Sequence, residues 1–288
     1  MNVLEQIVLG WHSLLFTLRH LTSRAMWLPW LLLGIVQLSI VAAIWWFAHP
    51  LVSWLMAPVL RRLGGEEVLH YPALFRAMPA LYARADFVVT AVLGALAAGA
   101  STALFATALE THDGGPRPNG VAGLFGALRR ALPLIAVNLP LNLLVVGFAF
   151  GLETWLAGRG SSGIIHKLGG FVTLGGALAI QAFFLYGTAW VVLGRKSFLG
   201  AWRELPHSAA RGYWAALFLG ILATLPLLPF QQVARHVQTL VSRGRPELAG
   251  WLVVAQVFVT LLTAFLLTGA ITVVYHTSIL RTDEEHGS

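Results

Sequence analysis

The chain has 288 residues, of which 57% are hydrophobic and only 11% are charged, and its formal net charge is +7. Soluble domains carry about 25% charged residues, so this composition excludes a soluble globular protein. The chain has no cysteine, which excludes disulfides, cysteine-ligated metals and thiol chemistry. The basic residues lie between apolar stretches, where we expect them to meet anionic lipid headgroups rather than nucleic acid.

The first segment, residues 3–24, is expected to form an amphipathic helix. Its apolar residues recur at helical spacing from Leu4 to Leu21, with Trp11 on the same face, while Arg19 lies off it. A helix with tryptophan on its apolar face suits the membrane interface.

Six apolar stretches follow, and each approaches or exceeds the roughly 20 residues that span a bilayer core of about 30 Å. They cover residues 27–57, 87–109, 131–156, 168–193, 213–230 and 250–280. The sequence therefore predicts an all-α polytopic membrane protein with about six transmembrane helices. Because the connections between stretches are short, residues 1–288 are expected to form a single integral membrane domain.

Residues 68–86, just before the second span, are expected to form a further interfacial helix; a lid or a partner surface is the alternative. Leu74 and Met78 share its apolar face, and Arg76 points elsewhere. Asp86 then stands at the start of the span, within reach of an aqueous interface. Charge in the middle of a span is the best functional signal in a membrane protein, and its scarcity here argues against coupled ion transport.

Similar short basic phrases precede three of the spans. They read LLFTLRHL at 14–21, LFGALRRAL at 124–132 and FLGAWREL at 198–205. This similarity predicts a threefold internal repeat of helical hairpins, each led by an interfacial amphipathic helix; chance likeness among apolar sequences is the alternative. The repeat units would be 1–118, 119–194 and 195–288. Repeats in membrane folds often place function at the repeat interface.

The third phrase is the most informative of the three. Arg203, His207 and Arg211 follow one another at i, i+4 and i+8 and form a cationic strip, and Pro206 is expected to bend the helix before the fifth span. The residues expected to contact lipid headgroups or an acidic partner are Arg129, Arg130, Trp202, Arg203, His207 and Arg211.

Uncharged polar residues inside the spans are the remaining candidates. Asn138 and Asn142 lie one helical turn apart around Pro140, which frees a backbone carbonyl near residue 136. They either bond to that carbonyl or a neighbouring helix, or they line a polar cavity at a broken helix. The candidate cavity or helix-packing residues are Gln37, Asn138, Asn142, Gln181 and Gln256.

Motifs of enzymes and cofactor sites are missing from the sequence. There is no CxxCH, no HxxxH within a span, no GxxxxGK[ST] and no GxSxG. We therefore expect a protein that is not an enzyme, with no catalytic residue, no cofactor and no metal.

The stretch FLYGTAWVVLGRKSFLGAWRELPHSAARGYWAALFLGILATLPLLP combines an apolar span, a basic linker and a span that begins with aromatic residues. Over these 45 or so residues the chain resembles bacterial six-span inner-membrane proteins, namely the YciC-like proteins and the membrane domains attached to glycerophosphodiester phosphodiesterases. The matching residues are Gly194, Ala201, Arg203, Ser208, Arg211 and Trp214. The resemblance implies a helical protein of the bacterial inner membrane and carries over no catalytic residue, and the phosphodiesterase domain is missing.

The orientation follows from the three basic phrases and the acidic tail TDEEHGS, which favour both termini in the cytoplasm; the lysine and arginine count alone hardly decides it. Two functions remain open. The first is a non-enzymatic membrane subunit or scaffold of a larger assembly, with lipids and other membrane subunits as partners. The alternative is a permease or a lipid-handling transporter component whose polar residues line a path.

Overall fold

The computed structural model describes residues 1–112, 115–157, 163–242 and 245–280, and the regular elements within them are all helical. Six helical segments in this part of the chain are long and apolar enough to cross a membrane, as the sequence predicts. They are Arg24–Trp45, Ala73–Thr111, Ala131–Phe148, Phe171–Val192, Phe198–Ala234 and Glu247–Ile279. The chain is therefore built as a multi-pass helical membrane protein.

The chain divides into two compact units. Unit 1 contains Met1–Pro29, Ala95–Ala223 and Phe265–Ser288, and unit 2 contains Trp30–Gly94 and Thr224–Ala264. Two long helices, α2 (Arg24–Trp45) and α13 (Glu247–Tyr275), contribute residues to both units. The single domain, the threefold repeat and the cytoplasmic termini stay predictions, and the acidic tail lies outside the described residues.

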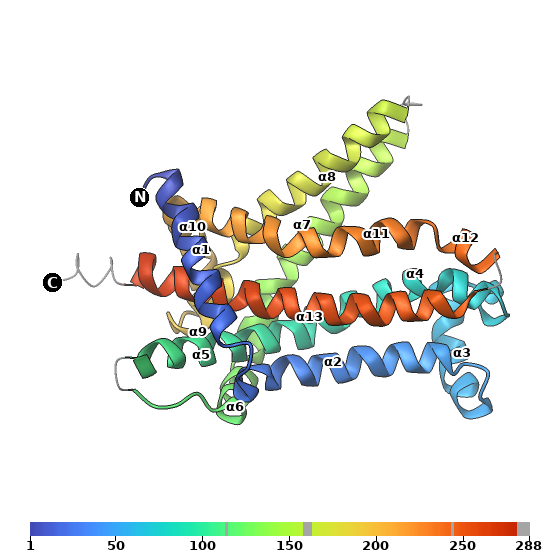
Figure 1. Cartoon of the computed structure of the whole chain (residues 1–288), viewed down its shortest axis with the longest axis horizontal. Coiled ribbons are helices and arrows are strands. Elements are labelled where there is room, and N and C mark those ends of the chain that lie inside the picture. The colour runs from blue at the N-terminus through green and yellow to red at the C-terminus, as the bar shows by residue number, and fades with distance from the viewer. Residues whose placement is uncertain (113–114, 158–162, 243–244, 281–288) are drawn as a thin grey trace. The chain divides into compact units, whose positions relative to one another are not determined.

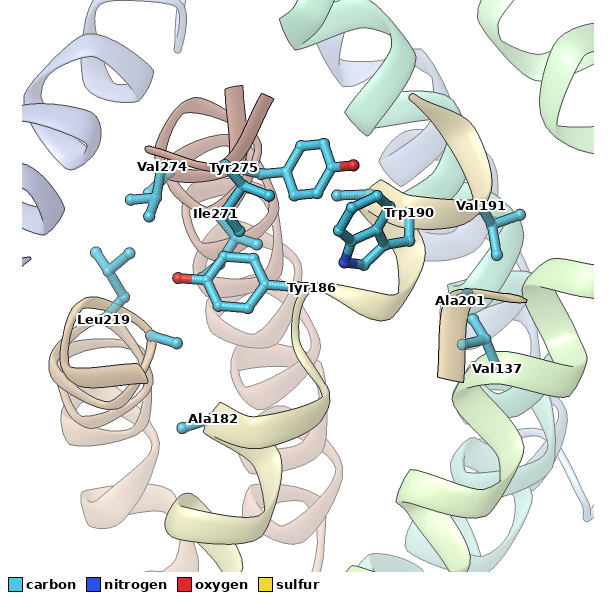
Figure 2. Packing of buried hydrophobic residues seen from close by; sticks show 14 of the residues in the cluster. Val137, Ala182, Tyr186, Trp190, Val191, Ala201, Leu219, Ile271, Val274 and Tyr275 are labelled. Atoms are coloured by element: carbon cyan, nitrogen blue, oxygen red, sulfur yellow. The ribbon is translucent and has the colours of Figure 1, made fainter. Parts of the chain in front are cut away.

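Unit 1 is a bundle of helices, with α7 and α8 side by side (Figure 1). Besides parts of α2 and α13 it contains α1 (Val3–Arg19), α5 (Ala95–His112), α6 (Gly120–Arg129), α7 (Ala131–Ala157), α8 (Gly163–Phe184), α9 (Gly187–Val192), α10 (Phe198–Thr224) and the π-helical η4 (His276–Leu280). Its core is apolar and aromatic. Figure 2 shows the rings of Tyr186, Trp190 and Tyr275 gathered within it.

Helix α1 packs onto unit 1 through small and polar residues rather than through its apolar stripe. The buried residues are Gln6, Gly10, Ser13 and Thr17. The side-chain oxygen of Gln6 accepts a hydrogen bond from the backbone N–H of Trp214 at 3.0 Å. Leu4 and Trp11 are exposed. Part of the apolar stripe therefore faces away from the chain, while Leu14 packs against the core of unit 1. Contact of the stripe with lipid stays a prediction.

Unit 2 contains most of α2, the first part of α13 and a set of shorter helices. These are α3 (Pro50–Gly64), η1 (Glu66–Leu69), α4 (Ala73–Val89), the π-helical η2 (Thr90–Gly94), η3 (Leu225–Leu227), α11 (Leu228–Arg235) and α12 (Val237–Ser242). Because α2 ends at Trp45 and α3 begins at Pro50, the predicted first span 27–57 is in fact two helices.

The predicted helix end at residue 86 is wrong. Helix α4 continues through η2 into α5, so that Ala73–Thr111 forms one helical segment. Leu74 and Met78, which share the predicted apolar face, are buried within the protein. Asp86 therefore lies inside this long segment and not at the start of a span.

Candidate functional site: a polar cavity in unit 1

A cavity of about 80 Å³ lies within unit 1. It is lined by α5, α7, α9 and α13 and by the turn that joins α8 to α9. The lining residues are Ala98, Thr102, Asn138, Leu141, Leu185, Thr188, Ala189, Leu267, Thr268 and Ile271. All of them are uncharged, so the cavity has an apolar wall with a few hydroxyl and amide groups on it.

Each of the four helices contributes one polar side chain to this cavity: Thr102 from α5, Asn138 from α7, Thr188 from α9 and Thr268 from α13. The Nδ2 of Asn138 donates to the Thr188 hydroxyl at 3.2 Å and to the backbone oxygen of Leu134 at 2.9 Å. With both amide hydrogens committed in this way, Asn138 can offer its oxygen to a ligand.

One of the candidate spans is interrupted beside the cavity. Within Phe171–Val192, α8 ends at Phe184 and α9 begins at Gly187, and Leu185 in the intervening turn lines the cavity. Irregular backbone at membrane depth is tolerated where it is buried in protein or lines a cavity. Discontinuous helices of this kind form the substrate sites of many transporters.

Two residues at the interruption hold this geometry. The Tyr186 ring is fully buried, and its hydroxyl donates to the backbone oxygen of Gly212 on α10 at 2.7 Å. Gly187 lets α9 come close to α7, because a Cβ there would lie only 2.8 Å from a methyl of Val137. This close approach is what brings Thr188 within hydrogen-bond distance of Asn138.

Among the five predicted polar candidates, Asn138 alone lines this cavity. It bonds to the carbonyl of Leu134 and not to the one near residue 136. Asn142 on α7 and Gln181 on α8 are half-buried beyond the lining. Gln37 and Gln256 belong to unit 2, where Gln256 is half-buried and Gln37 is buried and donates to Asp86 at 2.6 Å.

The three threonines of the cavity were not predicted. Threonine is common in membrane helices, where its hydroxyl can bond to the backbone of its own helix, so a single threonine in an apolar run carries little signal. The interruption at Tyr186 and Gly187 is the one local signal. A glycine directly after aromatic residues breaks the apolar run next to Thr188.

Two residues predicted to meet headgroups also make contacts within unit 1. The Arg130 guanidinium donates to the backbone oxygens of Val191 and Val192, at 2.8 and 2.7 Å, and so caps the end of α9. The Trp202 ring packs between Phe184 and Phe198. These contacts within unit 1 were not predicted, and headgroup contact of either side chain stays a prediction.

For the other cationic residues, contact with lipid headgroups or an acidic partner also stays a prediction. Arg129, Arg203 and His207 are exposed, and Arg211 is half-buried. A separate interfacial helix before the fifth span is not formed, however, because α10 runs unbroken through Pro206. The cationic strip is the first half of this long helix.

No family model, curated protein or solved structure matches the chain. The likeness to YciC-like proteins therefore stays an expectation that rests on the residues around α10. Two of these are packing residues. Ala201 is fully buried, and the Ser208 hydroxyl accepts a hydrogen bond from the indole N–H of Trp190 at 2.5 Å.

Proposed function

We propose that this chain is a permease of the bacterial inner membrane that passes a small, uncharged polar solute. The observation that carries the proposal is the cavity of unit 1, on which four helices converge with one polar side chain each, beside an interrupted span. An apolar pocket with a few convergent polar groups is the usual form of a small-molecule site. Protein interiors are close-packed and contain few voids larger than a water molecule, so a cavity of this size is a notable feature of the bundle.

The chemistry of the lining favours a neutral solute. None of the ten lining residues carries a charge, and an ion placed among them would lack a counter-charge in a medium of low dielectric constant. Thr102, Thr188 and Thr268 can each donate and accept a hydrogen bond, and Asn138 can accept one. A volume of about 80 Å³ admits a molecule of only a few heavy atoms. Urea and glycerol are suitable probes of this class.

An enzymatic role is not part of the proposal. Hydroxyl and amide groups without a neighbouring base or acid do not form an activated nucleophile. Anionic lipid headgroups remain proposed partners of the exposed Arg129 and Arg203.

A scaffold subunit is the second candidate, and one observation favours it. The outer face of α6 and the start of α7 expose large apolar residues in a row, among them Phe125, Leu128 and Leu132. Lipid covers such a face equally well, but a neighbouring membrane subunit would also fit it.

The substitution Asn138→Leu tests the proposal that the chain is a permease. We expect the protein-dependent entry of urea or glycerol into liposomes to fall about five- to thirtyfold, because the loss of a hydrogen bond of about 1–2 kcal/mol at the site corresponds to that range. Osmotic swelling followed by light scattering measures this rate. Asn142→Leu is the matched control, one turn away on α7 and not in the lining, and should retain the rate.

Both variants should remain folded, with a stability loss on the order of 1–2 kcal/mol at most. Thermal unfolding of the same preparations checks this. Equal rates for Asn138→Leu, Asn142→Leu and the unmodified chain would contradict the assignment of the cavity. An unmodified chain that admits neither probe faster than empty liposomes would favour the scaffold.

A further inference from the structure

A carboxylate in unit 2 lacks a cationic partner. The Oδ1 of Asp86 accepts hydrogen bonds from Gln37 Nε2 at 2.6 Å, from the Tyr82 hydroxyl at 3.3 Å and from the Thr90 hydroxyl at 3.2 Å. All three donors, one amide and two hydroxyl groups, are uncharged. Within the described residues, the ion pairs join Arg61 to Glu66 and Lys196 to Glu204, and none involves Asp86.

The depth of this carboxylate in the membrane can be inferred from the position of Gln37 on α2. Helix α2 has 22 residues, a length of about 33 Å, which matches a hydrocarbon core of about 30 Å. Gln37 lies within about 4 Å of the midpoint of α2 at the helical rise of 1.5 Å per residue. Because Asp86 is hydrogen-bonded to it, the carboxylate lies near the same depth. An ionisable group there is costly and by default marks a functional site.

The side chain of Gln37, which donates to Asp86, also carries an oxygen without a hydrogen-bond donor in the described part of the chain. Gln37 is only 1% exposed, and its Oε1 is buried without a hydrogen-bond partner among the described residues. The opposite orientation of the amide would set its oxygen against a carboxylate oxygen, so the donor must face Asp86. A buried acceptor left without a donor or a cation is unfavourable. Within the described residues, Asp86 has no ion-pair partner and Gln37 Oε1 has no hydrogen-bond donor, and a single cation would supply both needs.

We propose that Asp86 and Gln37 bind a compact monovalent cation, for which sodium is the probe. The ligands are a carboxylate oxygen of Asp86 and Oε1 of Gln37. One carboxylate balances one positive charge, whereas a divalent ion would leave a net charge in an apolar setting. Oxygen donors suit such a hard cation, and no group of three His, Cys, Asp or Glu able to hold a transition metal occurs in the described part of the chain.

The local helix geometry agrees with this assignment. Thr90 begins the π-helical turn η2, and single π-helical turns inside α-helices frequently occur at functional sites. Tyr82 is buried, Asp86 is half-buried and Thr90 is exposed, so the carboxylate is covered on the Tyr82 side and partly accessible on the Thr90 side. The proposal rests on unit 2 alone and does not depend on the cavity of unit 1.

Sodium-dependent stability tests the site on the purified full-length chain. Replacing choline chloride with sodium chloride at equal ionic strength should raise the unfolding temperature by about 2–5 °C, because a ligand that binds only the folded state stabilises it. Asp86→Asn and Gln37→Met should lose this shift. Gln256→Met, which removes another half-buried glutamine of unit 2, should keep it. Equilibrium binding of radioactive sodium should approach one ion per unmodified chain.

Two results would overturn the proposal. One is an unmodified chain that is stabilised by none of lithium, sodium and potassium and binds no radioactive sodium. The other is a sodium shift that persists in Asp86→Asn. Where a variant fails to fold, the stoichiometry measured on the unmodified chain decides, since it requires no substitution.

Discussion

Replacing Trp190 with alanine is expected to lower the free energy of unfolding by about 3–5 kcal/mol, the usual cost of deleting a buried tryptophan. The indole is only 4% exposed and meets the Tyr275 ring edge to face at a centroid distance of 5.1 Å. Its N–H donates to the Ser208 hydroxyl. Alanine would leave a void at the centre of unit 1 and remove the donor to Ser208.

The measurement is unfolding in mixed micelles with increasing dodecyl sulfate, followed by circular dichroism. Trp54→Ala is the matched control, since that indole is 79% exposed, and its free energy of unfolding should change by no more than about 0.5 kcal/mol. Equal losses in the two variants would show that Trp190 does not lie in a packed core.

A single methyl group at Gly212 is expected to cost about 1–3 kcal/mol, the range for an overpacked core. Gly212 lies on α10 directly against Tyr186, and a Cβ there would overlap both the hydroxyl and the ring. Relief would require the tyrosine to move, which would break its hydrogen bond to the Gly212 carbonyl. Because Tyr186 forms the turn beside the cavity, the same change should also disturb the site.

Gly220→Ala on the same helix is the control, since its Cβ would make an ordinary contact at 3.6 Å with a methyl of Leu178. It should be neutral or slightly stabilising, because alanine favours a helix over glycine. Thermal unfolding of both variants gives the comparison. Combining Gly212→Ala with Tyr186→Phe should cost less than the sum of the two changes, because the residues are in contact. Strict additivity would speak against the contact.

The number of spans could be predicted from the sequence because it depends on runs of apolar residues. The helix boundaries could not. Residues 73–89 contain Pro79, Arg84 and Asp86, which together favour a helix end, yet the helix continues because its buried face packs within unit 2. This error put Asp86 at the start of a span, whereas its carboxylate lies within a continuous helical segment and accepts a hydrogen bond from Gln37 on α2.

The candidate cavity could be predicted only in part. Asn138 was found because an amide in an apolar run is rare, whereas Thr102, Thr188 and Thr268 are unremarkable one at a time. They form a site because four helices bring them together, and that convergence is a property of the tertiary structure. The role of Arg130 was missed for a similar reason, since the carbonyls that it caps lie some sixty residues away along the chain.

The interfacial helices illustrate another limit. The sequence of α1 shows where its apolar residues lie, but an apolar stripe can face either lipid or protein. The structure shows that Gln6 and Gly10 face the bundle, because small or hydrogen-bonding residues allow two helices to approach closely. A pattern of small residues at helical spacing is the signal that would have identified this contact face.

Access of water to Thr188 tests the permease most directly. The chain has no cysteine, so Thr188→Cys introduces a single thiol into the cavity. In folded, reconstituted protein this thiol should react with a small water-soluble methanethiosulfonate, and urea or glycerol should slow the reaction. Ala182→Cys, at a site that is 1% exposed and outside the lining, should react only after denaturation. A thiol at position 188 that also stays unreactive until the protein unfolds would contradict a solute site there.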